Sequence, residues 1–114
     1  MKRFSLGIAA LAGLALAVSI AGCASYRGAR LYRAGSAALE RGEIASAVES
    51  LERAAALVPH ASEIQNHLGL AYQAAGRREE ALRAFRRSVA LDCDNRPAAH
   101  NLALAERGDP DATP

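Results

Sequence analysis

Two cysteines and three histidines are the residues of this chain best suited to nucleophilic or metal chemistry. His60, His67 and His100 show neither the HxxxH nor the HExxH spacing that places two metal ligands on one helix face. If the sulfur of Cys23 is modified, the chain has no second cysteine that could form a disulfide with Cys93. Cys93 is then a free thiol, pairs between chains, or is a small turn residue. A glycine-rich phosphate loop and a GxSxG motif are both missing from the sequence. We therefore expect no catalytic, cofactor or metal site, and Cys93 as a redox or hydrolytic thiol is the remaining enzyme hypothesis.

Cys23 follows a segment that is typical of an export signal. Lys2 and Arg3 begin it, residues 4–22 carry no charge, and small residues stand near its end. This order of basic, apolar and small residues is the pattern of a cleaved signal peptide. The segment ends in the tetrapeptide Ile20-Ala21-Gly22-Cys23. That tetrapeptide resembles a bacterial lipobox, and the resemblance implies a lipoprotein in which residues 1–22 are removed and Cys23 carries acyl chains such as palmitate.

The same resemblance bears on the location of the protein. Two or more acyl chains hold a protein stably on a membrane. In lipoproteins of diderm bacteria, an aspartate after the lipidated cysteine is associated with retention at the inner membrane. Ala24 stands at that position, so the resemblance implies the periplasmic face of the outer membrane, with the inner membrane as the alternative. An uncleaved transmembrane helix is the competing interpretation of the apolar run, but the content of alanine and glycine and the lipobox-like end weigh against it.

A short tether is expected to join the lipidated cysteine to the folded domain. Residues 23–27 reach at most about 17 Å when fully extended, so the domain is expected to sit against the lipid headgroups. Arg27, Arg30 and Arg33 lie three residues apart beyond Tyr26. They either touch anionic lipid or form a solvated helix face.

The domain itself is built from a repeat. Moving the block 62–95 back by 34 residues sets Gly69 on Gly35, Gly76 on Gly42, Ala81 on Ala47 and Phe85 on Leu51. In each block, apolar residues recur at helical spacing on both sides of the second glycine. Apolar residues make up 51% of the chain but aromatic residues only 4%, so alanine and leucine dominate and the composition is helical. A fixed period of this length indicates a helical repeat array.

The matching residues resemble the tetratricopeptide repeat (TPR) family. That family has a small residue where its helices A and B meet, a glycine at the turn, an alanine followed four residues later by a large apolar residue, and a closing proline such as Pro59. Cys93 stands where the second closing proline is expected. The resemblance implies an all-α fold, a short TPR solenoid. Its parts are repeat 28–61, repeat 62–95, a capping helix 96–107 and a flexible tail 108–114.

Local signals predict how these helices begin and end. Gly42 is expected to take the left-handed conformation that ends a helix. Ser62 with Gln65 three residues later is typical of a capping box. In the last helix, Pro97 stands in the first turn, where proline is tolerated. Glu106 puts a polar residue at a repeat position that is otherwise buried, which suits an outer capping helix.

In TPR proteins a groove lined by one face of the A helices holds the partner. Carried onto this chain, the resemblance implies a peptide-binding groove formed by Tyr32, Ser36, Leu39, Glu63, Asn66, Leu70, Gln73, His100 and Leu104. Leu70 and Leu104 are expected to point away from the A–B interface and to suit an extended or helical peptide. The alternative is that they pack inside a short, curved array. The positions of the family's carboxylate clamp hold Tyr32, Ser36, His67, Pro97 and Asn101, of which one fits.

The charge balance argues against nucleic acid as a partner. The formal net charge of +2 comes from Lys2 and Arg3, because without them the basic residues equal the 12 acids in number. The arginines of residues 77–87 are interspersed with acids, as on a solvated helix face. We therefore expect an adaptor that binds a protein or peptide in envelope assembly, such as pilus, secretion, polysaccharide-export or cell-wall machinery. A self-associating structural lipoprotein, a homodimer whose groove is filled by its own copy, is the alternative.

Overall fold

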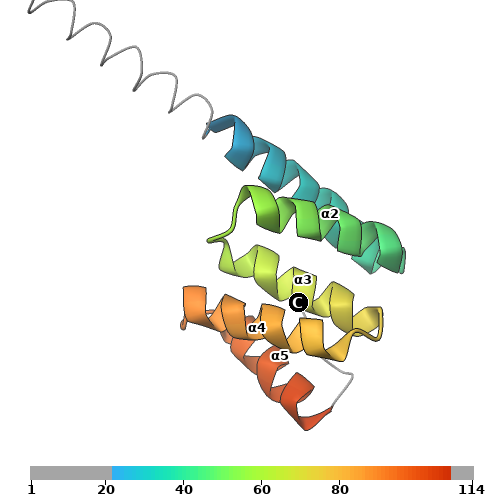
Figure 1. Ribbon diagram of the computed structural model, residues 1–114, viewed down its shortest axis with the longest axis vertical. Helices are drawn as coiled ribbons and strands as arrows, with labels where there is room; N and C mark the ends of the chain where they lie inside the picture. Colours follow the sequence, from blue (N-terminus) through green and yellow to red (C-terminus); the bar gives the residue numbers. More distant parts are fainter. Residues whose placement is uncertain (1–21, 109–114) are drawn as a thin grey trace, which may run out of the picture.

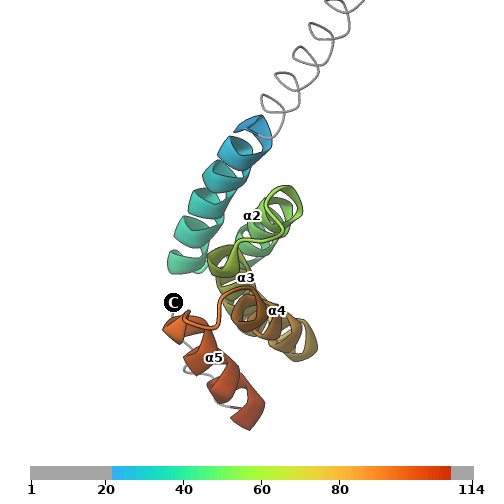
Figure 2. The same ribbon diagram turned by 90° about the vertical axis from the view of Figure 1, so that its left-hand side faces the viewer.

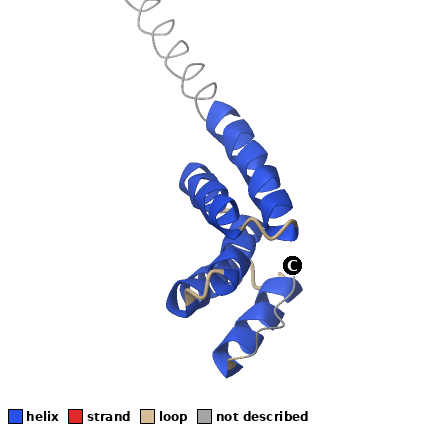
Figure 3. Cartoon of the chain, turned by 90° about the vertical axis from the view of Figure 1, so that its right-hand side faces the viewer, coloured by secondary structure: helices blue, strands red, loops and turns tan. Residues whose placement is uncertain are grey.

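Residues 22–108 are described by a computed structural model, and within this range the chain is helical and contains no strand (Figure 3). A first helix covers residues 22–40. The helices after it are α2 (Ile44–Leu57), α3 (Ser62–Ala74), α4 (Arg78–Leu91) and α5 (Arg96–Arg107). The expected all-α class is thereby confirmed. The predicted signal peptide up to residue 21 and the tail 109–114 lie outside the described residues.

The helices stack one after another along the molecule (Figure 1). Helix α3 packs against both α2 and α4, and α5 packs on α4 and α3. Seen from the side, the first helix and α5 lie on one side of the stack, α2 and α4 lie on the other, and α3 runs between them (Figure 2). This is the arrangement of a short solenoid of two helix-turn-helix repeats with a closing helix.

The turn between the two helices of each repeat has the same construction in both repeats. Gly42 and Gly76 have φ angles of 73° and 74°, a left-handed conformation that glycine adopts without steric cost. In the first turn the N–H of Glu43 donates to the carbonyl of Ala38 over 2.9 Å. In the second turn the N–H of Arg77 donates to the carbonyl of Tyr72 over 2.8 Å. These bonds satisfy carbonyls that each helix end would otherwise leave open.

The core is centred on one large residue per repeat. Leu51 and Phe85 are both fully buried, and each lies against a glycine of helix A. A Cβ atom at Gly35 would be 2.6 Å from Cγ of Leu51, and one at Gly69 would be 2.5 Å from the Phe85 ring. Because no side chain fits there, glycine lets helices A and B approach closely.

The start of α3 differs from the predicted capping box. The N-cap residue is Ala61, without a side-chain cap, and Ser62 bonds to other elements. Its Oγ donates to the carbonyl of Ser88 over 3.0 Å and accepts from Nδ2 of Asn95 over 2.8 Å, while Oγ of Ser88 donates to the carbonyl of Ser62 over 2.7 Å. The capping-box prediction is wrong because α4 lies close enough to bind the Ser62 hydroxyl. The N-cap of α5 is Asn95, whose side chain accepts from the N–H of Ala98 over 3.0 Å.

The beginning of the first helix also differs from the expectation. Residues 23–27, predicted as a tether, are helical and continue into the first helix. Gly28 does not interrupt it, because the glycine is buried where a Cβ atom would collide with the side chain of Val58. Cys23 is therefore joined to the domain by a helix with a rise of about 1.5 Å per residue. Within the described range, no helix has both the length and the apolar character needed to cross a bilayer.

Candidate functional site

The residues predicted to line a groove come from the first helix, α3 and α5, the helices that follow the concave side of the stack (Figure 2). Their exposure varies. Glu63 and His100 are exposed. The half-buried members are Tyr32, Ser36, Leu39 and Gln73, and the buried members are Asn66, Leu70 and Leu104. The concave side therefore presents mainly polar groups above a closely packed floor.

The sequence led us to expect that Leu70 points away from the interface between helices A and B. In the structure it does not. It is 7% exposed and packs with Leu82 and Phe85 of α4 and with Ala105 of α5. Leu104 is buried to the same degree. The reason is the position of α5, which crosses both α3 and α4 and covers the inner side of α3. Neither leucine is free to serve as an apolar anchor for a peptide.

Hydrogen bonds join each A helix (the first helix, α3 and α5) to the next A helix, at equivalent positions of the repeat. The hydroxyl of Tyr32 lies 3.3 Å from Nδ1 of His67, and the two rings meet edge to face with centroids 5.0 Å apart. One repeat later, Nδ2 of Asn101 donates to Oδ1 of Asn66 over 2.9 Å. We call these two contacts the A-helix ladder. Sequence reasoning missed it, although both pairs join residues 35 positions apart.

In the A-helix ladder, the Tyr32–His67 contact is half-buried and the Asn66–Asn101 contact is buried. Burial raises the pKa of the Tyr32 hydroxyl, and the negative charge of Glu63 raises it further, so the phenol stays protonated. His67 Nδ1 also lies 3.0 Å from the carbonyl of Glu63. Asn66 and Asn101 are 3% and 0% exposed. The carboxylate-clamp positions His67 and Asn101 thus bond within the protein.

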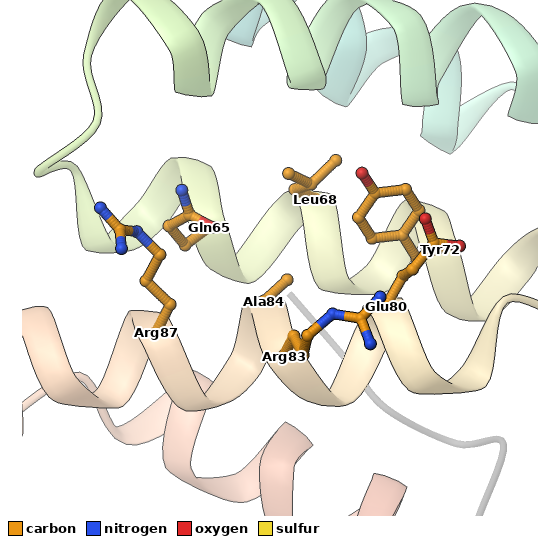
Figure 4. A pocket seen from close by; sticks show the side chains of 7 residues that line it. All are labelled: Gln65, Leu68, Tyr72, Glu80, Arg83, Ala84 and Arg87. Atoms are coloured by element: carbon orange, nitrogen blue, oxygen red, sulfur yellow. The ribbon is translucent and has the colours of Figure 1, made fainter.

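A hollow lies on the side of α3 opposite the concave side, beside α2. No motif in the sequence predicted it. It has a volume of about 220 Å³. Figure 4 shows the apolar side chains of Leu68 and Ala84 between two polar ends. The polar lining residues are Gln65, Tyr72, Glu80, Arg83 and Arg87.

Contacts with α2 and its following turn define both ends of this hollow. At one end, the Tyr72 hydroxyl donates to Oε1 of Glu52 over 2.7 Å, and the Arg77 guanidinium lies 4.6 Å from the centre of the Tyr72 ring. At the other end, Arg87 donates to the carbonyl of Pro59 over 3.2 Å. The hollow is thus a product of the packing between repeats.

Within the described residues, the two cysteines lie on separate elements. Cys93 is an exposed thiol in the turn between α4 and α5, and Cys23 is exposed on the first helix. Between residues 22 and 108, no three side chains of histidine, cysteine, aspartate or glutamate gather as metal ligands would.

Comparison with known proteins agrees with the repeat pattern. The family model for the tetratricopeptide repeat matches residues 38–111. None of the curated proteins matches the chain.

Proposed function

The chain belongs to the tetratricopeptide repeat family, whose repeats generally mediate protein–protein interaction, and we propose that it is a lipid-anchored adaptor of the bacterial cell envelope. In this proposal, acyl chains on Cys23 hold it at the periplasmic face of the outer membrane. Its concave side binds a segment of a protein partner in pilus, secretion, polysaccharide-export or cell-wall machinery. The protein itself catalyses no reaction.

The A-helix ladder is the observation that supports binding on the concave side. A surface that is rigid before binding loses less entropy when a partner docks. Here the side chains of consecutive A helices are tied together by Tyr32–His67 and Asn66–Asn101. Glu63 and His100 stand exposed beside these pairs, and they offer a carboxylate and an imidazole to polar groups of a peptide.

The lipobox-like end of the apolar segment supports the anchor, and so does the exposure of Cys23. Labelled palmitate added to growing cells is expected to mark the wild-type chain, and the Cys23→Ser variant is expected to remain unlabelled. A wild-type chain without label would remove the anchor from the proposal and leave the binding role standing.

The concave side is tested by changing the charge at its two exposed predicted groove residues, Glu63 and His100. For the double variant Glu63→Arg, His100→Glu, we expect the amount of partner protein that cross-links to the tagged full chain in membranes to fall at least about ten-fold. The reason is that the new charges oppose a complementary partner. Leu70→Glu is unsuitable for this test, since Leu70 is buried and a charge there would unfold the domain.

The control is an exposed glutamate on the other side of the stack. Glu49 lies on α2, where its side chain is 74% exposed. Glu49→Arg is expected to retain the cross-linked partner. Equal loss from both variants would indicate a nonspecific charge effect. Unchanged binding in both would assign the partner to another surface, such as the hollow beside α2.

A further inference from the structure

One face of the first helix carries an unbalanced positive charge. With about 100° of rotation per residue, Cys23, Tyr26, Arg27, Arg30 and Arg33 fall within an arc of about 120°. All five are exposed. We call Tyr26, Arg27, Arg30 and Arg33 the arginine face. Cys23, the proposed lipid attachment site, lies in the same arc.

The three arginines of this face differ from four other arginines of the domain, which pair with acids. Arg41, Arg53 and Arg77, for example, form salt bridges with nearby glutamates. Within residues 22–108, neither Arg27, Arg30 nor Arg33 forms one. The first acidic residue of the sequence is Glu40, at the far end of the helix. The face is therefore free to bind an anionic surface.

The rest of the domain leaves this face open. The other side of the helix packs on the first repeat, where Gly28 lies against Val58 and Gly35 against Leu51. Helices α2 to α5 follow on one side of the first helix (Figure 1). Tyr26 is 65% exposed and is the one large hydrophobic side chain exposed in the described part of the chain. Aromatic rings of this kind partition into the headgroup layer of a bilayer.

We propose that the arginine face lies flat on the anionic headgroups of a phospholipid bilayer, so that the first helix runs along the membrane surface. This inference rests on the membrane attachment proposed above and adds the orientation of the domain. Tyr32 lies about 180° around the helix from Cys23, so the concave side is turned away from the lipid. The face from Cys23 to Arg33 would then contact the membrane over about 15 Å.

A fluorescent reporter placed along this face tests the orientation. The chain contains no tryptophan, so Ala34→Trp in the full chain supplies a single fluorophore. Ala34 is exposed and lies within the same arc, eleven residues beyond Cys23. In vesicles of phosphatidylglycerol with brominated acyl chains, we expect strong quenching at low salt. Quenching should fall in about 0.5 M salt and in phosphatidylcholine vesicles, because screening and loss of lipid charge remove the attraction.

Two controls separate a flat helix from simple anchoring. A reporter at the exposed residue Ala99 of α5, made as Ala99→Trp, should remain unquenched because α5 is at the far end of the stack (Figure 1). Charge reversal in the triple variant Arg27→Glu, Arg30→Glu, Arg33→Glu should release the Ala34→Trp reporter from the membrane. For each arginine, the ratio of first helices lying flat on the membrane to those free of it should fall about five-fold.

A matched triple variant changes the charge equally elsewhere. Arg83, Arg96 and Arg107 are exposed on α4 and α5, and their replacement by glutamate should leave the quenching of the Ala34→Trp reporter unchanged. The proposal is overturned if this reporter is unquenched in anionic vesicles, or if it is quenched equally in neutral vesicles and in high salt. A partner of acidic protein or nucleic acid in place of lipid would give the first of these results.

The same samples show which proposal fails. Intact-mass measurement reports whether Cys23 carries acyl chains. A lipidated chain with an unquenched reporter at Ala34 would overturn the flat orientation alone. An unlipidated chain whose reporter is quenched in a charge-dependent way would support the arginine face and refute the anchor.

Discussion

At the scale of single residues, Tyr72 shows how one side chain joins two repeats. Its ring lines the hollow beside α2, its hydroxyl donates to Glu52, and the Arg77 guanidinium stands over its ring. Burial raises the pKa of Tyr72 to about 12, and the hydrogen bond to Glu52 and its charge raise it too. The neutral phenol is therefore the form that the fold stabilises.

This pKa predicts a loss of stability at high pH. Because the pKa of Tyr72 is raised from 10.0 to about 12 in the folded chain, its contribution to stability is fully present below pH 10 and is lost as the pH rises toward 12. Tyr72→Phe should weaken this decline, measured as the urea midpoint from pH 9 to 12. The control Tyr26→Phe, at an exposed ring, should keep the wild-type decline. Identical pH curves for wild type and Tyr72→Phe would contradict the assignment.

At the scale of helices, α5 acts as a cap because its inner face is held and its outer face is polar. Asn101 is fully buried and bonds to Asn66 of α3, while Glu106 and Arg107 at the end of the helix are exposed. Gly108, with a φ angle of 79°, ends the helix. The buried amide pair specifies where α5 sits, because a displaced helix would leave both amides without their partner.

Removing one amide of this pair should destabilise the domain. Asn101→Ala leaves Oδ1 of Asn66 without this buried donor, at a cost of about 1–3 kcal/mol in the free energy of unfolding. Denaturant unfolding followed by circular dichroism measures it. The neighbouring exposed residue provides the control, since His100→Ala should change the free energy by less than about 0.5 kcal/mol. If Asn101→Ala and His100→Ala are equally mild, the amide pair does not hold the cap.

At the scale of the whole molecule, the array is short but both of its ends are closed to further stacking. Repeat arrays need polar outer faces at their ends to remain soluble. Here the arginine face covers one end, and the polar end of α5 helps cover the other. Tyr26 is the one large hydrophobic side chain exposed between residues 22 and 108, so this range lacks the apolar surface of an obligate dimer.

We therefore predict one chain per particle. Light scattering of the lipidated protein in detergent, corrected for bound detergent, should give the mass of a single polypeptide over a ten-fold range of concentration. A stable dimer would favour the alternative of a structural lipoprotein whose groove is filled by its own copy. In that case the Glu63→Arg, His100→Glu variant should become monomeric.

The helical class, the period of 34 residues and the turns can be read from the sequence alone. These features are local: Gly42 and Gly76 adopt a positive φ angle without strain, and an apolar residue every three or four positions fits one helix face. The recurrence of Gly35 at Gly69 was also readable, and the structure places these glycines against Leu51 and Phe85. The concave location of the candidate site followed from the family resemblance.

What the groove presents, and where several polar groups bond, depends on how the helices pack against one another. Leu70 and Ser62 look available in their own helices, but α4 and α5 bury the first and bond the second. The A-helix ladder, the hollow beside α2 and the open arginine face depend likewise on which helices cross and which side they leave uncovered. Periodicity predicts that a face exists, whereas burial and hydrogen bonding between helices far apart in sequence determine whether that face remains free to bind.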